Sequence, residues 1–288
     1  MPASAGSARG QADSLPPEPA MPVTVVFVSG LFGECVDAIA SPFGDSYLRL
    51  RSAGFRVLNV PVEGRSSSQR NAGLIDAFLS GQIGPHENVV VIGHSKGVVD
   101  MLQALGDFGH RAWVSRIRAL VSVAGAIMGS AIADQYASTY EGLAARLPFP
   151  TCAPGDGGAV NSLTSITRAM AMQAFEPPGH VLLFSLAAVA DPARVNALLS
   201  TFHARLSRLS PRNDGQLLAQ DTILPGSIFL GYAIADHWAV ALPFNRSDSA
   251  FAAQLAGHNA YPREVLLDSL LAMVQERLRA RSGVLRAD

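Results

Sequence analysis

The side chains best placed to do chemistry are those of Ser95, His237 and Asp214. Ser95 stands at the centre of Gly93-His94-Ser95-Lys96-Gly97, between an apolar β-branched run and a stretch that suits a buried helix. A serine hydroxyl becomes a nucleophile when a histidine accepts its proton and a carboxylate orients that histidine. His237 follows the last predicted strand, and Asp214 lies 23 residues before it in an Asn-Asp-Gly turn. These three residues are the candidate nucleophile, base and acid.

The glycines of this pentapeptide suit a sharp turn from a strand into a helix. Side chains at Gly93 and Gly97 would collide with neighbouring backbone in such a turn. The turn would lift the Ser95 hydroxyl clear of the sheet, at the first turn of the helix. The backbone amide of Lys96 would then point to where an oxyanion forms. An ordinary glycine-bounded crossover is the alternative for the pentapeptide taken alone.

Other acids and histidines are weaker candidates. Asp191, nearer the end of the fifth predicted strand, is the second choice for the acid, ahead of Asp221 and Asp236, and Asn-Asp-Gly is also a common surface turn. His94 lies inside the pentapeptide, but we expect its side chain to point elsewhere. Solvated or packing roles are expected for the remaining histidines, which are His86, His110, His180, His203 and His258.

The predicted strands alternate with helices in an order that would bring the candidates together. Strands are expected over 23–28, 55–60, 88–92, 118–125, 180–186 and 228–232. Helices are expected over 45–53, 71–79, 98–105, 163–175, 192–209 and 263–281. This order predicts a mostly parallel six-stranded α/β sheet, covered on both faces. Parallel strands end at one edge, so His237 after the sixth strand can reach Ser95 after the third.

The first strand ends in Ser29-Gly30-Leu31-Phe32-Gly33, where glycines allow a tight turn and leave amides unpaired. Together with the pentapeptide, this resembles the α/β-hydrolase family, whose first core strand often ends in His-Gly-x-x-Gly; Ser29 replaces the histidine. The resemblance, to bacterial lipases and esterases in particular, implies the α/β-hydrolase fold with a nucleophile elbow at Ser95. It also implies an oxyanion hole formed by the amides of Leu31 and Lys96, and the order Ser95, Asp214, His237 is the family's order.

The activity that this resemblance implies is cleavage of carboxylic esters, of lipase or carboxylesterase type, through a Ser-His-Asp triad and an acyl-enzyme. An acyltransferase or a thioesterase would use the same triad, and a depolymerase of hydroxyalkanoate-type polyesters differs only in its substrate. A non-catalytic binding protein of the same fold is disfavoured, because binding alone needs no triad.

One hydrolase domain is expected over residues 23–281, with flexible tails at 1–22 and 282–288. The alternation of strands and helices breaks over about 126–178, where the resembled family places a helical cap or lid; additional helix packed on the core is the alternative. The N-terminal tail lacks the positive start and apolar core of a secretory signal. A cytoplasmic protein is therefore expected if the chain is complete, whereas a trimmed secreted protein would look the same.

Composition narrows the classes of partner. Apolar residues make up 49% and charged residues 16%, which suits a large core, and the net charge of -1 leaves no footprint for nucleic acid. No run approaches the roughly 18 apolar residues of a membrane span. No metal-ligand spacing is visible, so we expect no metal or cofactor and a small or lipid-like ester substrate; the oligomeric state is open. Cys35 and Cys152 are expected to be free thiols, with one bridge as the alternative.

The basic residues are 21 arginines and a single lysine, Lys96, next to the candidate nucleophile. The simplest interpretation is a helical pair with Asp100 at i+4, worth only tenths of a kcal/mol on a surface. A second is a bridge to Glu34 or Asp37 that holds the oxyanion loop against the elbow. A third is a cation that meets an acidic substrate, such as a hydroxyacid oligomer.

Overall fold

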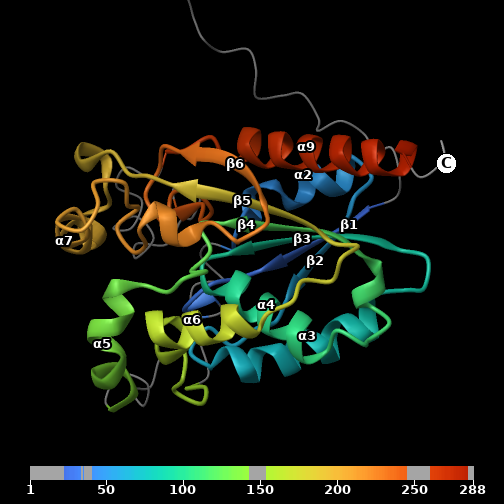
Figure 1. Cartoon of the computed structure of the whole chain (residues 1–288). Helices are drawn as coiled ribbons and strands as arrows, with labels where there is room; N and C mark the ends of the chain where they lie inside the picture. The colour runs from blue at the N-terminus through green and yellow to red at the C-terminus, as the bar shows by residue number, and fades with distance from the viewer. Residues whose placement is uncertain (1–22, 34, 36–40, 143–153, 245–259, 285–288) are drawn as a thin grey trace, which may run out of the picture.

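A six-stranded parallel sheet forms the centre of the computed structural model, which describes residues 23–33, 35, 41–142, 154–244 and 260–284 (Figure 1). The order across the sheet is β2-β1-β3-β4-β5-β6, and every neighbouring pair is parallel. The strands are β1 (Val23–Val28), β2 (Arg56–Val60), β3 (Asn88–His94), β4 (Ile117–Val123), β5 (Leu182–Ala188) and β6 (Ile228–Ala233). The predicted six-stranded, mostly parallel α/β sheet is confirmed.

Helices cover both faces of this sheet (Figure 1). On one face lie α2 (Tyr47–Ser52) and α9 (Arg263–Val284), and on the other lie α3 (Ser68–Gln82) and α4 (Lys96–Asp107). Alternate residues of a strand point to opposite faces, so β1, buried along its whole length, supplies both cores. Its continuous apolar sequence is the pattern expected of a strand covered on both sides.

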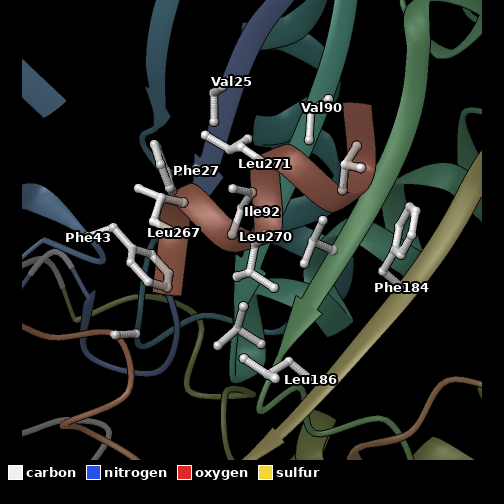
Figure 2. Close-up of a cluster of buried hydrophobic side chains, with 14 of the residues drawn as sticks. Val25, Phe27, Phe43, Val90, Ile92, Phe184, Leu186, Leu267, Leu270 and Leu271 are labelled. Atoms are coloured by element: carbon white, nitrogen blue, oxygen red, sulfur yellow. The ribbon is translucent and has the colours of Figure 1, made fainter. Parts of the chain in front are cut away.

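The core on the α9 face shows how the C-terminal helix is held. Leu267, Leu270 and Leu271 project from α9 toward Phe27 of β1 and Ile92 of β3 (Figure 2). All of these side chains are almost completely buried. Burial of a leucine or phenylalanine of this kind contributes about 1.5–3 kcal/mol, so the C-terminal helix is an integral layer of the domain.

Several helix boundaries differ from the sequence-based expectations, for reasons of local hydrogen bonding. The α3 helix begins at Ser68 rather than at residue 71, because the Ser67 hydroxyl accepts a hydrogen bond from the Arg70 amide at 3.2 Å. The helix expected over 45–53 is a 3₁₀ turn, η1 (Gly44–Ser46), followed by α2.

The helix expected over 192–209 is also shorter than predicted. It consists of a 3₁₀ turn, η5 (Pro192–Arg194), and the helix α7 (Ala197–Leu206). Asn196 separates them, because its side chain accepts a hydrogen bond from the Leu198 amide and so starts a new helix.

The predicted insertion over 126–178 contains α5 (Ala131–Gly142), η4 (Asn161–Leu163) and α6 (Ser165–Ala174). Ala133, Val160 and Leu163 of the insertion pack with Leu31 and Phe32 of the loop after β1. Met172 and Phe175 instead pack on the core beneath α3 and α4. One part of the insertion therefore adjoins the loop after β1, and another part is additional structure on the core. Its role as a cap stays a prediction.

The expectation of two free thiols is wrong, because Cys35 is disulfide-bonded and no cysteine among the described residues is free. Cys152, the other cysteine of the sequence, lies outside the described residues. A disulfide requires two Cα atoms within about 7 Å, and sequence spacing over more than a hundred positions does not reveal such proximity.

The chain ends predicted as tails are only partly described. Residues 1–22 and 285–288 lie outside the described ranges, whereas α9 continues as far as Val284. Within the part of the chain that the structure describes, no helix combines the length and the apolar character that crossing a membrane requires.

The close approach of α4 to β1 depends on the absence of a side chain at Gly97. A Cβ atom there would overlap the carbonyl oxygens of Val28 and Ser29, which are main-chain atoms and cannot turn away. We expect Gly97→Ala to lower the free energy of unfolding by about 2–3 kcal/mol or more in urea denaturation. Gly73→Ala is the control, since Gly73 is exposed within α3 and a Cβ there meets nothing within 4 Å. It should stabilise the protein by up to about 1 kcal/mol, and equal effects of both changes would contradict the packing argument.

Candidate active site

Ser95 occupies the turn between β3 and α4 in a backbone conformation that non-glycine residues rarely adopt. Its φ is 55° and its ψ is -124°. The turn is held on both sides: the Ser95 amide donates to the Val123 carbonyl at 3.2 Å, and the Ser95 carbonyl accepts from the amides of Val98 and Ala126 at 3.3 Å. A conformation of this kind costs about 1–3 kcal/mol and persists only where the surroundings determine it.

The structure brings the three candidate side chains into one hydrogen-bonded line. The Ser95 Oγ atom lies 2.8 Å from Nε2 of His237, and Nδ1 of the same ring lies 2.7 Å from Oδ2 of Asp214. All three residues are buried, and Asp214 has no exposed surface. Little water competes for these hydrogen bonds, so they are stronger than they would be on a surface.

Asp214 is fixed by the turn that carries it. Its second oxygen, Oδ1, accepts hydrogen bonds from the amides of Gln216 at 2.8 Å and Leu217 at 2.7 Å. Its main-chain carbonyl accepts from the His237 amide at 2.9 Å. Gly215 has a φ of 93°, which explains the glycine of the Asn-Asp-Gly turn. The carboxylate therefore binds the amides of its own turn through Oδ1 and the imidazole of His237 through Oδ2.

The other acids considered for this position lie elsewhere. Asp191 is exposed and caps η5 by accepting from the Ala193 amide at 3.0 Å. Asp236 is buried, and burial raises its pKa although it accepts three main-chain hydrogen bonds. Burial also raises the pKa of Asp221. Within the described structure, none of the three makes a hydrogen bond to the His237 ring.

The two amides proposed for the oxyanion hole flank the nucleophile. A Cβ atom on Gly30 would lie only 2.8 Å from the Cβ of Ser95, so the loop after β1 packs directly against the elbow. In that loop the Phe32 amide donates to Gly64 and the Gly33 amide donates to Gly30. The amides of Leu31 and Lys96, in contrast, have no hydrogen-bond acceptor among the described residues.

Lys96 faces the protein interior. Its Nζ atom lies 2.7 Å and 2.9 Å from the two carboxylate oxygens of Asp100, and neither side chain has appreciable exposed surface. The i+4 pair is confirmed, although its burial makes it more consequential than a surface pair. The interpretation of Lys96 as a cation that meets the substrate is wrong, because the side chain is inaccessible. Glu34 and Asp37 lie outside the described residues.

His94 is the site residue that sequence reasoning missed. We expected its side chain to point elsewhere, but its ring centroid lies 4.9 Å from that of His237. Its Nε2 atom lies 2.9 Å from the His237 carbonyl oxygen, which can only accept, so Nε2 carries the hydrogen. A histidine inside the pentapeptide was visible in the sequence. Its contact with a loop 143 positions later was not.

The His94 imidazole is held neutral by its surroundings. Its Nδ1 atom is buried and has no hydrogen-bond partner in the described part of the chain. Burial is the largest cause that lowers the pKa of His94 to about 3; His237 lowers it further, against the opposing effect of the hydrogen bond to the carbonyl. A neutral His94 supports the loop of His237 without adding a positive charge beside it.

An apolar cavity of about 650 Å³ opens onto Ser95 and His237. Its walls come from the loop after β1, from the insertion, from α7 and from the loop that follows β6; they include Leu31, Tyr136, Leu163, Phe202 and Trp238. The lining residues that the structure describes include no lysine, arginine, aspartate or glutamate. Such a cavity suits an uncharged, largely apolar group.

The parallel sheet, the strained serine turn at the carboxyl end of β3 and the histidine after the last strand together define the class of α/β hydrolases. No protein-family model matches the chain, and neither does any sequence among the curated proteins compared with it. Solved structures do match, among them a carboxyl esterase and bacterial lipases.

The metagenomic carboxyl esterase MGS0156 is 34% identical and covers 91% of this chain and 78% of its own, with a TM-score of 0.85. This chain therefore belongs to the carboxyl esterase family of α/β hydrolases, and it is a carboxylic-ester hydrolase. Two more distant structures share the fold. The mature Bacillus licheniformis lipase BlEst2 is 22% identical over 77% of this chain and 87% of its own, with a TM-score of 0.59. The Staphylococcus hyicus lipase is 13% identical over 94% and 100%, with a TM-score of 0.65.

The neutral, buried state of His94 predicts a specific loss of stability in acid. The unfolded chain binds a proton at His94 below pH 6.5, whereas the native protein does not until about pH 3. The stability from this group is thus present above pH 6.5 and is lost as the pH falls toward 3. When the pH is lowered from 7.5 to 5.5, the free energy of unfolding should fall in the wild type by about 1.4 kcal/mol more than in His94→Gln, as measured by urea denaturation. His94→Asn should behave alike, and an identical pH dependence in all three proteins would refute the argument.

Proposed function

We propose that this protein hydrolyses uncharged carboxylic esters through Ser95, His237 and Asp214, by way of an acyl-enzyme. The observation that carries the proposal is the continuous line of hydrogen bonds from the Ser95 hydroxyl to the Asp214 carboxylate, beside two main-chain amides that are open. Family membership supports an ester as the substrate. The absence of charged side chains from the described cavity wall favours a neutral one.

The tautomer of His237 follows from its partners. A carboxylate accepts hydrogen bonds, so Nδ1 carries the hydrogen and donates it to Asp214. The lone pair of Nε2 then faces the Ser95 hydroxyl, which donates to it at 2.8 Å. This is the arrangement that a general base requires before it removes the serine proton.

In the acylation step, Nε2 of His237 takes the Ser95 proton while Oγ attacks the ester carbonyl carbon. The carbonyl oxygen becomes an oxyanion, which accepts hydrogen bonds from the amides of Leu31 and Lys96. His237 then gives the proton to the leaving alcohol as its bond to carbon breaks. In deacylation, water replaces the serine hydroxyl in the same sequence and releases the acid. Asp214 stabilises the imidazolium formed at each stage.

The cavity indicates which part of the substrate the protein binds. Its aromatic and aliphatic walls are joined to Ser95 without an intervening charged side chain in the described lining. We infer that it holds the acyl group, with the segment over 126–178 acting as a cap that supplies part of the wall. An apolar acyl chain gains about 0.8 kcal/mol for each methylene that it buries.

Ser95→Ala should abolish ester hydrolysis, because no nucleophile remains. With p-nitrophenyl esters of increasing acyl length, we expect a loss of kcat of at least about 10⁴-fold at every length. A fluorophosphonate probe should label the wild type at Ser95 and leave the variant unlabelled. A wild type that neither hydrolyses the esters nor reacts with the probe would indicate a binding protein of the same fold.

Asp214→Asn should lower kcat by about 10⁴-fold, because the amide no longer holds His237 in the tautomer that accepts the serine proton. Asp191→Asn is the matched control: the same change at an acid that only caps η5 should leave kcat within about twofold of the wild type. Steady-state kinetics on one ester distinguishes the two. A larger loss at Asp191 than at Asp214 would reassign the acid.

A further inference from the structure

A buried asparagine joins the nucleophile elbow to the loop that follows β2. Nδ2 of Asn71, on α3, donates to Oδ2 of Asp100 at 2.7 Å and to the Glu63 carbonyl at 3.0 Å. Its Oδ1 accepts from the Glu63 amide at 3.0 Å. Asn71 has no exposed surface. One side chain thus binds both the amide and the carbonyl of Glu63 and also contacts the Asp100 carboxylate behind the elbow.

The loop held by Asn71 in turn supports the oxyanion loop. The carbonyl of Gly64, the next residue after Glu63, accepts from the Phe32 amide at 3.1 Å. The two main chains touch, since a Cβ on Gly64 would lie 2.6 Å from the amide nitrogens of both Phe32 and Gly33. Phe32 has a φ of 58°, a conformation that a bulky residue adopts only when its surroundings impose it. The contact with Gly64 is one such constraint.

The other end of the connection is the elbow itself. Asp100 binds Lys96 through both oxygens, and the main-chain amide of Lys96 is one of the two proposed oxyanion donors. The second donor, the Leu31 amide, immediately precedes Phe32. A continuous path of short polar contacts therefore runs from Lys96 through Asp100, Asn71 and the Glu63–Gly64 main chain to the residue next to Leu31.

The charged side chains in this path are shielded from water. Asp100 and Lys96 are buried, and the buried guanidinium of Arg168, on α6, lies close enough to be influenced by the Asp100 charge. Burial lowers the pKa of Arg168 to about 10, against the opposing effect of Asp100. A buried ion pair adds little net stability when both charges lose water, but it strongly restricts geometry because neither charge tolerates separation.

We propose that Asn71 is a positioning residue for ester hydrolysis, which sets the spacing of the Leu31 and Lys96 amides by linking Asp100 to the Glu63–Gly64 main chain. This role rests on the proposed function. An oxyanion hole needs its donors about 2.7–3.1 Å from the developing oxyanion and held within about 0.5 Å of that geometry, so contacts that fix the loop after β1 matter for catalysis. The buried pair that Lys96, the only lysine of the chain, forms with Asp100 stands at one end of this link.

The test compares two buried polar truncations on the same helix. Asn71→Ala removes the link, whereas Asp76→Ala removes hydrogen bonds to Trp113 and Arg111 that do not reach the site. For each variant we would measure the melting temperature, kcat and KM on a p-nitrophenyl ester, and the inhibition constant of an alkyl boronic acid. In the adduct, the Ser95 oxygen bonds to boron, His237 takes its proton, and a boron-bound oxygen occupies the oxyanion hole.

For Asn71→Ala we expect kcat to fall about 10–100-fold, the boronate to bind more weakly by a similar factor, and KM to stay within about threefold. For Asp76→Ala we expect a lower melting temperature, with kcat and boronate affinity within about twofold of the wild type. Equal kinetic losses in the two variants, or a loss of kcat with unchanged boronate affinity, would overturn the positioning role.

Gly64→Ala reaches the same loop without disturbing the buried charges, so it decides the question if Asn71→Ala does not fold. Its added Cβ would push the main chain of Phe32 and Gly33, and we expect the same paired loss of kcat and boronate affinity. A kcat and a boronate affinity of Gly64→Ala within about twofold of the wild type would refute the proposal. Wild type and Ser95→Ala are assayed alongside: if they are equally inactive the proposed function itself fails, whereas an active wild type with unaffected variants rejects only the role of Asn71.

Discussion

The close contact between the start of α4 and the end of β1 is the constraint on which the site depends. Gly97 packs against the carbonyls of Val28 and Ser29, and Gly30 packs against the Cβ of Ser95, so a glycine on each segment allows the close approach. That contact places the serine turn, which precedes Lys96, beside the loop after β1, which carries Leu31. The strained conformation of Ser95 persists because the bonds to Val123, Val98 and Ala126 hold it from three directions.

The polar groups around this contact lie in two separate sets. On the side of the cavity, His237 is hydrogen-bonded to Asp214 through Nδ1 and to Ser95 through Nε2. The neutral His94 contacts the main-chain carbonyl of His237. Behind the elbow, Lys96 and Asp100 form a buried ion pair that Asn71 links to the loop after β2. The cavity that opens onto Ser95 and His237 has largely apolar walls. This separation keeps the charges of Lys96 and Asp100 out of the cavity lining.

Most of the fold followed from local patterns. Apolar runs predicted all six strands, and the four central ones, β1, β3, β4 and β5, have the near-continuous apolar sequence that a strand buried on both faces needs. The errors were at helix starts, such as Ser68 and Ala197, where a single capping side chain decides the boundary. The pentapeptide predicts Ser95, the Asn-Asp-Gly turn favours Asp214, and the shared edge of parallel strands predicts that His237 can reach Ser95. The structure does bring the three within hydrogen-bonding distance.

Sequence alone therefore determined the sheet, the turn that presents Ser95 and the residues able to complete a triad, since each depends on periodicity or on chain order. Only the tertiary structure decided the surroundings of single side chains: that Lys96 faces Asp100 and no substrate, that His94 contacts His237, and that Cys35 is disulfide-bonded. The physical reason is that burial and long-range proximity depend on how separate elements pack. A difference of a few ångströms in that packing changes a surface cation into a buried structural one, and no local pattern of residues records it.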